Sequence, residues 1–354
     1  MVFLKNKNGL LLTAIGLLTA VFSSVAAFAE GEAGIISLRG QGHFYVGGET
    51  FEVPANPQAG PMFGAPGLAI KNQMYVGYQL VADPQHPYPL VLVHGGGGQA
   101  TDWFSTPDNR DGWRDYFLAA GFDVYWIDRP GYGRSPTSAD YGELGPNTSS
   151  GIISFLATAD LWPGDYSDPN DPSIQGWLAS SPPGPYAGNE IAAEDLSRLL
   201  DRIGPAIVIT HSAGGMTGWW AMDDNPDNVA GLIAIEAVGS NILGEDVRPG
   251  LTFSPALNTN LSADAEGCML QSQGSVSRLT NLQDKPVVLV GSPMGLTEAL
   301  GLDCATKTLR QAGVDASFTY LPDLGFEGNG HFMMADTNSD EIAQVIIDLA
   351  VDME

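Results

Sequence analysis

The chain has 354 residues, of which 44% are hydrophobic and 16% are charged, and its formal net charge is −26 at pH 7. This length and apolar content are sufficient for one large hydrophobic core that carries inserted segments. The strong negative charge repels phosphate backbones, so it argues against nucleic acid as a partner.

The N-terminus has the pattern of a secretory signal peptide. A segment with two lysines is followed by an apolar run over residues 10–22 and by the small-residue sequence AFA at 27–29. We therefore expect residues 1–29 to be removed and residues 30–354 to form a periplasmic or secreted chain without stable membrane association. An uncleaved anchor is the alternative, because no charge interrupts the apolar run.

Beyond this segment, apolar and β-branched runs alternate with amphipathic stretches, which is the pattern of βαβ units around a mostly parallel sheet. The strands that we expect are three leading antiparallel ones at 35–39, 43–46 and 75–81, and a central series at 90–93, 123–127, 206–210, 232–236, 286–290 and 317–321. The helices that we expect have apolar residues three and four positions apart and cover 113–120, 190–203, 213–222, 305–312 and 340–351. The sequence thus predicts one α/β domain.

Two long segments interrupt the alternation. Residues 136–186 are rich in Pro, Gly, Asp and aromatic residues, and residues 240–284 separate two strands by far more than a turn requires. Long ordered insertions in compact domains usually serve as lids or binding loops, so we expect these two to form a lid or cap. Ordinary surface loops are the alternative.

The chain has only two cysteines, Cys268 and Cys304. An oxidising compartment outside the cytoplasm favours a disulfide between them, which in the chain-entropy description stabilises the fold by about 3–4 kcal/mol. Two buried free thiols are the alternative. Neither cysteine has the spacing of a metal ligand, and no metal site is expected.

The first motif that carries chemistry is AIVITHSAGG at residues 206–215, where an apolar strand meets a helix at Ser212. A tight turn of this kind lifts a serine hydroxyl above the sheet and directs the next backbone N–H toward a developing oxyanion. Thr210 occupies the place of the first glycine of the usual G-x-S-x-G pattern, so it requires a local adjustment. A serine that only caps the helix is the alternative.

The second motif is VLVHGGGG at residues 91–98, a strand that ends in a run of glycines. Glycines allow the backbone to approach a substrate oxygen closely and to turn its N–H groups toward it. We expect an oxyanion hole formed by the N–H groups of Gly96 and Ala213, with Gly97 as the alternate donor. A phosphate-binding loop is disfavoured because no G-K-[ST] follows.

The third motif, DRPGYGRS at residues 128–135, follows the next strand. With the His-Gly turn before it and the serine elbow after it, the sequence from residue 90 to the C-terminus resembles the α/β-hydrolase superfamily. This resemblance implies the α/β-hydrolase fold, a mostly parallel central sheet flanked by helices with lid or cap insertions. It also implies that Asp128 shapes the site and performs no chemistry.

The general base follows by elimination among five histidines. His43 and His86 precede the motifs, His94 belongs to the His-Gly turn, and the side chain of His211 is expected to point away from the nucleophile next to it. Only His331 follows Ser212, and the order of the family is serine, acid, histidine. A surface histidine without a catalytic role is the alternative.

The acid has two candidates. Most of the family places it after the strand that here reads PVVLVG, where the nearest acids are Glu298 and Asp303. One branch, to which secreted bacterial serine esterases belong, instead uses a glutamate at the end of the preceding strand, and LIAIEAVG places Glu236 there. Its apolar surroundings make an unpaired charge costly. We prefer Glu236, with Asp303 as the second candidate.

These residues predict a carboxylic ester hydrolase that forms an acyl-enzyme on Ser212, with a small-molecule ester as substrate and no cofactor. A lactonase, an amidase, a carbon–carbon bond hydrolase and a non-catalytic binding protein are the alternatives. Six side chains near the motifs are candidates for the substrate pocket or for the core: Trp103, Phe104, Trp162, Trp177, Phe332 and Met333. The natural ester and the oligomeric state stay open.

Overall fold

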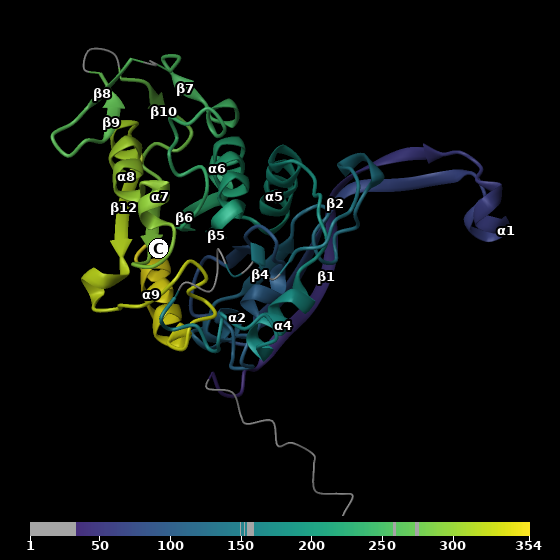
Figure 1. Ribbon diagram of the computed structural model, residues 1–354. Coiled ribbons are helices and arrows are strands. Elements are labelled where there is room, and N and C mark those ends of the chain that lie inside the picture. The colour runs from purple at the N-terminus through teal and green to yellow at the C-terminus, as the bar shows by residue number, and fades with distance from the viewer. Residues whose placement is uncertain (1–32, 149, 152, 154–158, 258–259, 273–275) are drawn as a thin grey trace, which may run out of the picture.

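The computed structural model describes residues 33–148, 150, 151, 153, 159–257, 260–272 and 276–354, so the expected signal peptide at 1–29 lies outside the described residues. One eight-stranded sheet crosses the molecule in the order β1-β2-β4-β3-β5-β6-β11-β12 (Figure 1). Its strands are β1 (Leu38–Val53), β2 (Gly67–Val81), β3 (Leu90–Val93), β4 (Val124–Asp128), β5 (Ala206–His211), β6 (Val229–Ile235), β11 (Pro286–Gly291) and β12 (Asp315–Tyr320).

The sheet is mostly parallel. β1 pairs antiparallel with β2 and β2 antiparallel with β4. The remaining neighbours in this sheet, in the order β4-β3-β5-β6-β11-β12, all pair in parallel. The six central strands match the expected ones to within a few residues. Five of them are largely buried apolar runs, which are visible directly in the sequence, whereas β12 at the edge of the sheet is mostly exposed or partly buried.

Helices cover both faces of the sheet. They are α2 (Trp113–Ala119), α4 (Pro172–Ser180), α5 (Asn189–Ile203), α6 (Gly215–Asp224), α7 (Thr297–Leu300), α8 (Leu302–Gln311) and α9 (Ser339–Val351). Successive residues of a strand point to opposite faces. Val91 and Val93 therefore pack in one core cluster with α5, α6 and α8, whereas Leu90 and Leu92 pack in a second cluster with α2 and α9. The expected α/β architecture is confirmed.

The N-terminal strands differ from the prediction. The sequence pattern predicts separate strands at 35–39 and 43–46, but one continuous strand, β1, runs from Leu38 to Val53. Gly42 looks like an interruption in the sequence, yet it pairs with Tyr78 of β2, and a Cβ there would lie 2.8 Å from the Tyr78 hydroxyl. The glycine thus makes room for a cross-strand tyrosine and does not end the strand.

Beyond the body of the molecule, β1 and β2 continue as a two-stranded hairpin, which ends in a short helix, α1 (Gly60–Phe63) (Figure 1). No element is expected from the sequence at residues 47–70, because this segment lacks both clear helical and clear strand periodicity.

The segment 240–284 forms two small antiparallel sheets. β7 (Phe253–Ser254) pairs with β10 (Arg278–Leu279), and β8 (Leu261–Ala263) pairs with β9 (Met269–Gln271). A disulfide joins Cys268 to Cys304 of α8 and thereby ties this segment to the main domain, which confirms the expected pairing. Among the described residues, no helix has the length and apolar character needed to cross a membrane.

Candidate active site

Ser212 lies in the sharp turn between β5 and α6. Its φ is 51°, in the left-handed region that a residue with a side chain rarely adopts, and residues Ser212–Gly214 form a 3₁₀ turn that leads into α6. A Cβ at Gly214 would lie 2.5 Å from the His94 carbonyl oxygen, and one at Gly215 would lie 2.3 Å from the Val238 carbonyl oxygen. These glycines are required because the turn packs directly against neighbouring backbone.

The side chain of Thr210 packs against α6 at the position of Gly218, which has no side chain. The side chain is fully buried, and a Cβ at Gly218 of α6 would lie only 2.5 Å from Thr210 Cγ2. The missing glycine of the elbow motif is therefore compensated by a glycine eight residues later, on the helix that packs over the strand.

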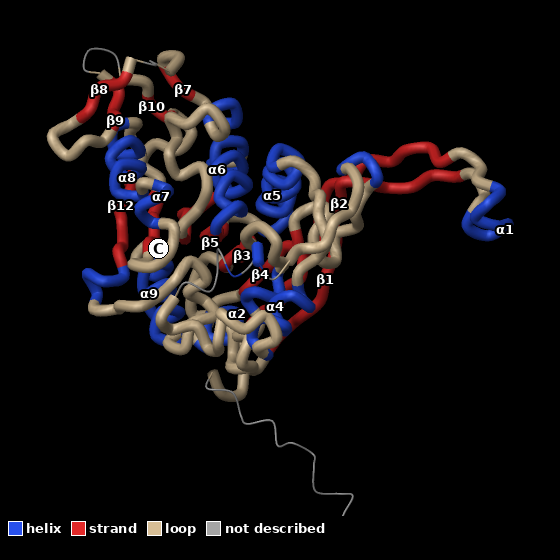
Figure 2. The backbone as a smooth tube through the Cα atoms, viewed as in Figure 1, coloured by secondary structure: helices blue, strands red, loops and turns tan. Residues whose placement is uncertain are grey.

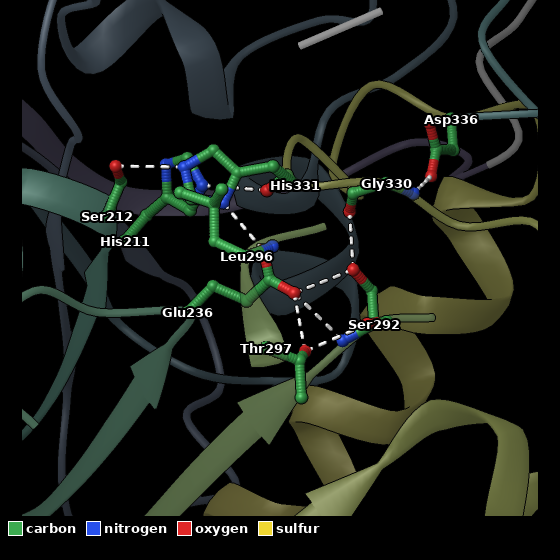
Figure 3. A network of polar contacts seen from close by, with 9 residues as sticks. All are labelled: His211, Ser212, Glu236, Ser292, Leu296, Thr297, Gly330, His331 and Asp336. Atoms are coloured by element: carbon green, nitrogen blue, oxygen red, sulfur yellow. Dashed lines mark hydrogen bonds and ion pairs between the residues drawn. The ribbon is translucent and has the colours of Figure 1, made fainter. Parts of the chain in front are cut away.

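Three side chains from distant parts of the chain meet beside this turn (Figure 3). His331 Nε2 lies 2.9 Å from Ser212 Oγ, and His331 Nδ1 lies 2.6 Å from Glu236 Oε2. The carboxylate accepts from Nδ1–H, which leaves Nε2 free to accept the serine proton. His331 and Glu236 are buried, whereas Ser212 is partly exposed.

Glu236 directly follows β6 and is held by several donors in addition to His331. Its φ is 40°, and its carboxylate accepts hydrogen bonds from the Ser292 N–H (3.0 Å), Ser292 Oγ (2.7 Å), the Leu296 N–H (2.8 Å) and Thr297 Oγ1 (2.8 Å) (Figure 3). Burial raises the pKa of Glu236, but the hydrogen bond and charge of His331 and these donors outweigh it and lower the pKa to about 2. The carboxylate is therefore ionised at neutral pH.

Asp303, the second candidate acid, lies elsewhere. It belongs to α8, its side chain is 64% exposed, and it forms an ion pair with Lys307 at 3.3 Å. The structure thus brings Glu236 into contact with His331 and leaves Asp303 at the surface.

The glycine-rich loop after β3 lies against the elbow. A Cβ at Gly95 would lie 3.0 Å from Ser212 Cβ, and one at Gly96 would lie 3.3 Å from Ala213 Cβ. Gly96, Gly97 and Ala213 line the same pocket as Ser212. Ala213 follows Ser212 at the start of a helical segment, where backbone N–H groups have no intrahelical acceptor.

The DRPGYGRS turn and the His-Gly turn support this loop. Asp128 is fully buried and accepts hydrogen bonds from the Ala100 N–H (2.9 Å) and the Arg134 N–H (2.8 Å). His94 Nδ1–H donates to the Gly95 carbonyl (2.8 Å), and its Nε2 accepts from the Arg129 N–H (3.1 Å). Burial, with the charge of Arg129, lowers the pKa of His94 to about 3, so the ring is neutral.

The orientation expected for His211 is wrong. Its ring lies against that of His331, with centroids 4.6 Å apart, and its Nε2–H donates to the His331 carbonyl oxygen at 2.9 Å (Figure 3). Burial, with the nearby His331, lowers the pKa of His211 to about 3, so it is a neutral donor. His211 is the last residue of β5 and has extended backbone (φ −123°, ψ 137°), so the place of its ring depends on how the His331 loop packs against β5, which the sequence pattern does not reveal.

A pocket of about 410 Å³ opens over Ser212. Trp177 and Phe332 form part of its wall, but Trp103, Trp162 and Met333 are buried in the core cluster on the α2 and α9 face, and Phe104 packs at the edge of that cluster. Residues of the segment 136–186 contribute to the lining, and none of the described residues of 240–284 does. The pocket is lined by Gly96, Gly97, Asn147, Thr148, Gly151, Trp177, His211, Ser212, Ala213, Val238, Leu296, His331 and Phe332.

Sequence reasoning missed the residues that hold the carboxylate of Glu236 and the loop that carries His331. Ser292 and Thr297 stand in SPMGLT, directly after β11, where the expected acid is absent but hydroxyl groups are present. Asp336 is also buried and accepts hydrogen bonds from the Gly330 N–H (3.1 Å) and Asn329 Nδ2 (3.0 Å). Burial raises the pKa of Asp336 to about 6.

In the described part of the chain, one group of side chains has the composition of a metal site. The two sulfurs of Cys268 and Cys304 and the carboxylate of Asp303 lie within 4.8 Å of one another. Both sulfurs are joined in the disulfide, so neither is a thiolate ligand.

Comparison with known proteins places these observations in a family. The sequence pattern of the family described as alpha/beta hydrolase fold matches residues 88–270. A protein named probable secreted lipase phiG, from Fungal sp. (strain ATCC 74256), is 32% identical over 309 residues, which cover 77% of this chain and 84% of that protein. A solved structure described as a novel bacterial esterase superposes with a TM-score of 0.69 at 22% identity, over 90% of this chain and 97% of the other. The chain therefore belongs to the alpha/beta hydrolase family.

Proposed function

We propose that this protein is a serine ester hydrolase in which Ser212 is the nucleophile, His331 the general base and Glu236 the acid that orients it. The observation that carries the proposal is the continuous hydrogen-bonded chain from Ser212 Oγ to His331 Nε2 (2.9 Å) and from His331 Nδ1 to Glu236 Oε2 (2.6 Å). A serine is weakly nucleophilic by itself, and a positioned base with its own orienting acid activates it.

The reaction proceeds in two halves. Ser212 Oγ attacks the ester carbonyl carbon while its proton passes to His331 Nε2, and the carbonyl oxygen becomes an oxyanion. When this intermediate collapses, the bond to the alcohol breaks, His331 protonates the leaving oxygen, and an acyl group stays on Ser212. Water then attacks the acyl carbon, again giving a proton to His331, and the carboxylic acid leaves as Ser212 regains its hydrogen.

The oxyanion is stabilised by the backbone N–H groups of Gly96 and Ala213, with Gly97 as alternate donor. All three residues line the pocket at Ser212, and a Cβ at Gly96 would make a tight contact of 3.3 Å with Ala213 Cβ, so the two donors lie close together. Fixed donors of this type stabilise the transition state more than the substrate, because charge develops on the oxygen only during attack.

The names of the similar proteins support an ester as the substrate. One is named a secreted lipase and another an esterase, and in this chain a serine and not an aspartate stands at the elbow. Trp177, Phe332, Val238 and Leu296 give the pocket apolar walls that suit an acyl or alcohol chain. We assign the protein to the carboxylesterase type and to the secreted bacterial branch with a glutamate after β6.

We also propose that residues 30–354 form one catalytic domain and that the segment 136–186 is a lid. Asn147, Thr148 and Trp177 of this segment line the pocket, so its movement changes access to Ser212. A periplasmic or extracellular location agrees with the disulfide, which persists in an oxidising compartment.

A fluorophosphonate probe tests the proposal, because it labels only an activated serine. We expect one label per chain and hydrolysis of p-nitrophenyl esters, with both lost in Ser212→Ala. Ser317→Ala, at an exposed position of β12, is the matched control and keeps both. Folded wild-type protein that neither takes the label nor hydrolyses any ester would contradict the proposal.

A further inference from the structure

The hairpin formed by residues 48–70, here called the arm, extends away from the body of the molecule (Figures 1 and 2). From Glu49 to Val53 every residue of β1 is exposed, and so are Gly67 and Leu68 of β2. The register pairs these two strands only with each other in this region, from Thr50 with Ile70 to Val53 with Gly67. The arm is therefore a two-stranded ribbon in solvent, an arrangement that is marginally stable by itself in water.

The arm carries large apolar side chains on both of its faces. Paired residues of an antiparallel ribbon point to the same face, so Phe51 and Val53 lie on one face and Leu68 and Ile70 on the other. Leu68 is 73% exposed, and Met62 and Phe63 at the tip are 80% and 84% exposed. Six large apolar side chains exposed on one hairpin are more than the scattered single ones of an ordinary surface, and such a concentration marks an interaction site.

The two edges of the sheet differ in their protection. β12, at one edge, has six residues, whereas β1, at the other, has 16 residues, with no lysine or proline and with Arg39, Glu49 and Glu52 as its only charged residues. Within the described part of the chain, no strand other than β2 pairs with β1. A long edge without the lysines or prolines that block pairing is a template for another strand.

We propose that the arm docks on the arm of a second copy of this chain, so that the protein is a two-fold dimer with the outer edge of β1 antiparallel to β1 of its partner. A two-fold axis places the same surface of both copies in contact, and two copies of one strand then satisfy each other's backbone donors and acceptors. The apolar faces of the two arms extend this contact.

The charge of the chain and the hydrogen-bonding groups of the β1 edge favour a second copy of this chain as the partner of the arm. Each copy has a formal net charge of −26, so two copies repel least where they meet through a surface with few charges; Glu49 and Glu52 are the only charged residues of the arm, and residues 53–70 contain none. A lipid surface is the other candidate for an apolar arm, but hydrocarbon offers no partner for the unpaired N–H and C=O groups of a sheet edge. A second copy supplies both the apolar contact and the hydrogen bonds.

The mass of the particle in solution tests this proposal independently of catalysis. We expect the mature chain to form a particle of two chains in sedimentation equilibrium, and the variants Leu68→Glu/Ile70→Glu and Met62→Glu/Phe63→Glu to raise the dissociation constant at least about 100-fold while ester hydrolysis per chain is unchanged. Leu324→Glu, at a leucine that is 52% exposed elsewhere on the surface, is the matched control and stays dimeric.

A shortened chain provides a second test, which does not depend on how the glutamate variants fold. In it residues 51–69 are replaced by Asn-Gly, which joins the paired residues Thr50 and Ile70 by a two-residue hairpin loop and keeps the register. We expect this shortened chain to be a folded monomer, which shows a cooperative thermal unfolding transition whose midpoint does not depend on protein concentration. Three results would each overturn the proposal: a wild-type monomer at about 100 µM, a shortened chain that is still dimeric, or a wild-type chain that binds phosphatidylcholine vesicles as a monomer.

Discussion

Glu236 and Asp303 are the two acids that the sequence offers as partners of His331, and the structure surrounds them in opposite ways. Glu236 is fully buried and accepts hydrogen bonds from His331, Ser292, Leu296 and Thr297. Asp303 is exposed and shares Lys307 with Asp264 and Glu266. Water competes with an exposed carboxylate for the N–H of a histidine, so such a carboxylate holds the ring weakly. A buried carboxylate with satisfied hydrogen bonds fixes the orientation of the ring, and only Glu236 meets this condition.

Substitution of the two acids is expected to differ most in its effect on the turnover number, kcat. We expect Glu236→Gln to lower kcat about 10⁴-fold, because an amide neither fixes the Nδ1–H tautomer nor stabilises the imidazolium, while Asp303→Asn changes kcat less than about twofold. Steady-state hydrolysis of a p-nitrophenyl ester measures both. A large loss in Asp303→Asn together with a small one in Glu236→Gln would reverse the assignment.

The disulfide beside Asp303 affects stability and not catalysis. Replacing Cys268 and Cys304 by alanine is expected to lower the free energy of unfolding by about 3–4 kcal/mol, since the bond closes a loop between residues 36 positions apart. Urea unfolding measures this loss. Because the bond lies outside the pocket, kcat at a temperature where the variant is folded stays within about twofold of the wild type, and a larger drop would show that the two regions are coupled.

The stability of the fold at acid pH depends on the protonation of Glu236. The pKa of Glu236 is lowered from its ordinary 4.5 to about 2. As the pH falls, the carboxylate of Glu236 therefore takes up a proton at a higher pH in the unfolded chain than in the folded one. The contribution of Glu236 to stability is then fully present above pH of about 4.5 and is lost as the pH falls toward about 2, a change of about 3 kcal/mol. Stability curves of the wild type and Glu236→Gln should converge over this interval, whereas the control Ser317→Ala, which changes no titratable group, should run parallel to the wild type.

The smallest effect concerns the donors that hold Glu236. Ser292→Ala removes one hydroxyl donor and leaves the Ser292 N–H in place, so we expect kcat to fall about 10-fold, in line with the loss of one hydrogen bond to a charged group. Ser317→Ala is the control. An unchanged kcat would mean that the remaining donors hold the carboxylate by themselves.

The central strands and the flanking helices of the fold were accessible from the sequence. Apolar runs such as LVLV at 90–93 and the three- and four-residue spacing of α5 are local signals, so their positions follow from short windows of the chain. The same holds for Ser212 and for the glycine-rich turn, because both depend on residues adjacent in sequence. The arm has no such local pattern. Each of its two faces carries both apolar and polar residues, and no residue of the arm is buried in the core.

By itself the sequence determined which residue types stand at the ends of the strands, and hence the position of Ser212, the proposed nucleophile, and of the one histidine that follows it. Only the tertiary structure placed Glu236 against His331 and Asp303 at the surface, turned His211 toward His331 and placed Gly218 over Thr210. These outcomes depend on contacts between residues far apart in the chain, such as the 95 positions between Glu236 and His331. Burial and hydrogen bonding across that separation are properties of the packed molecule, which no local pattern of residues contains.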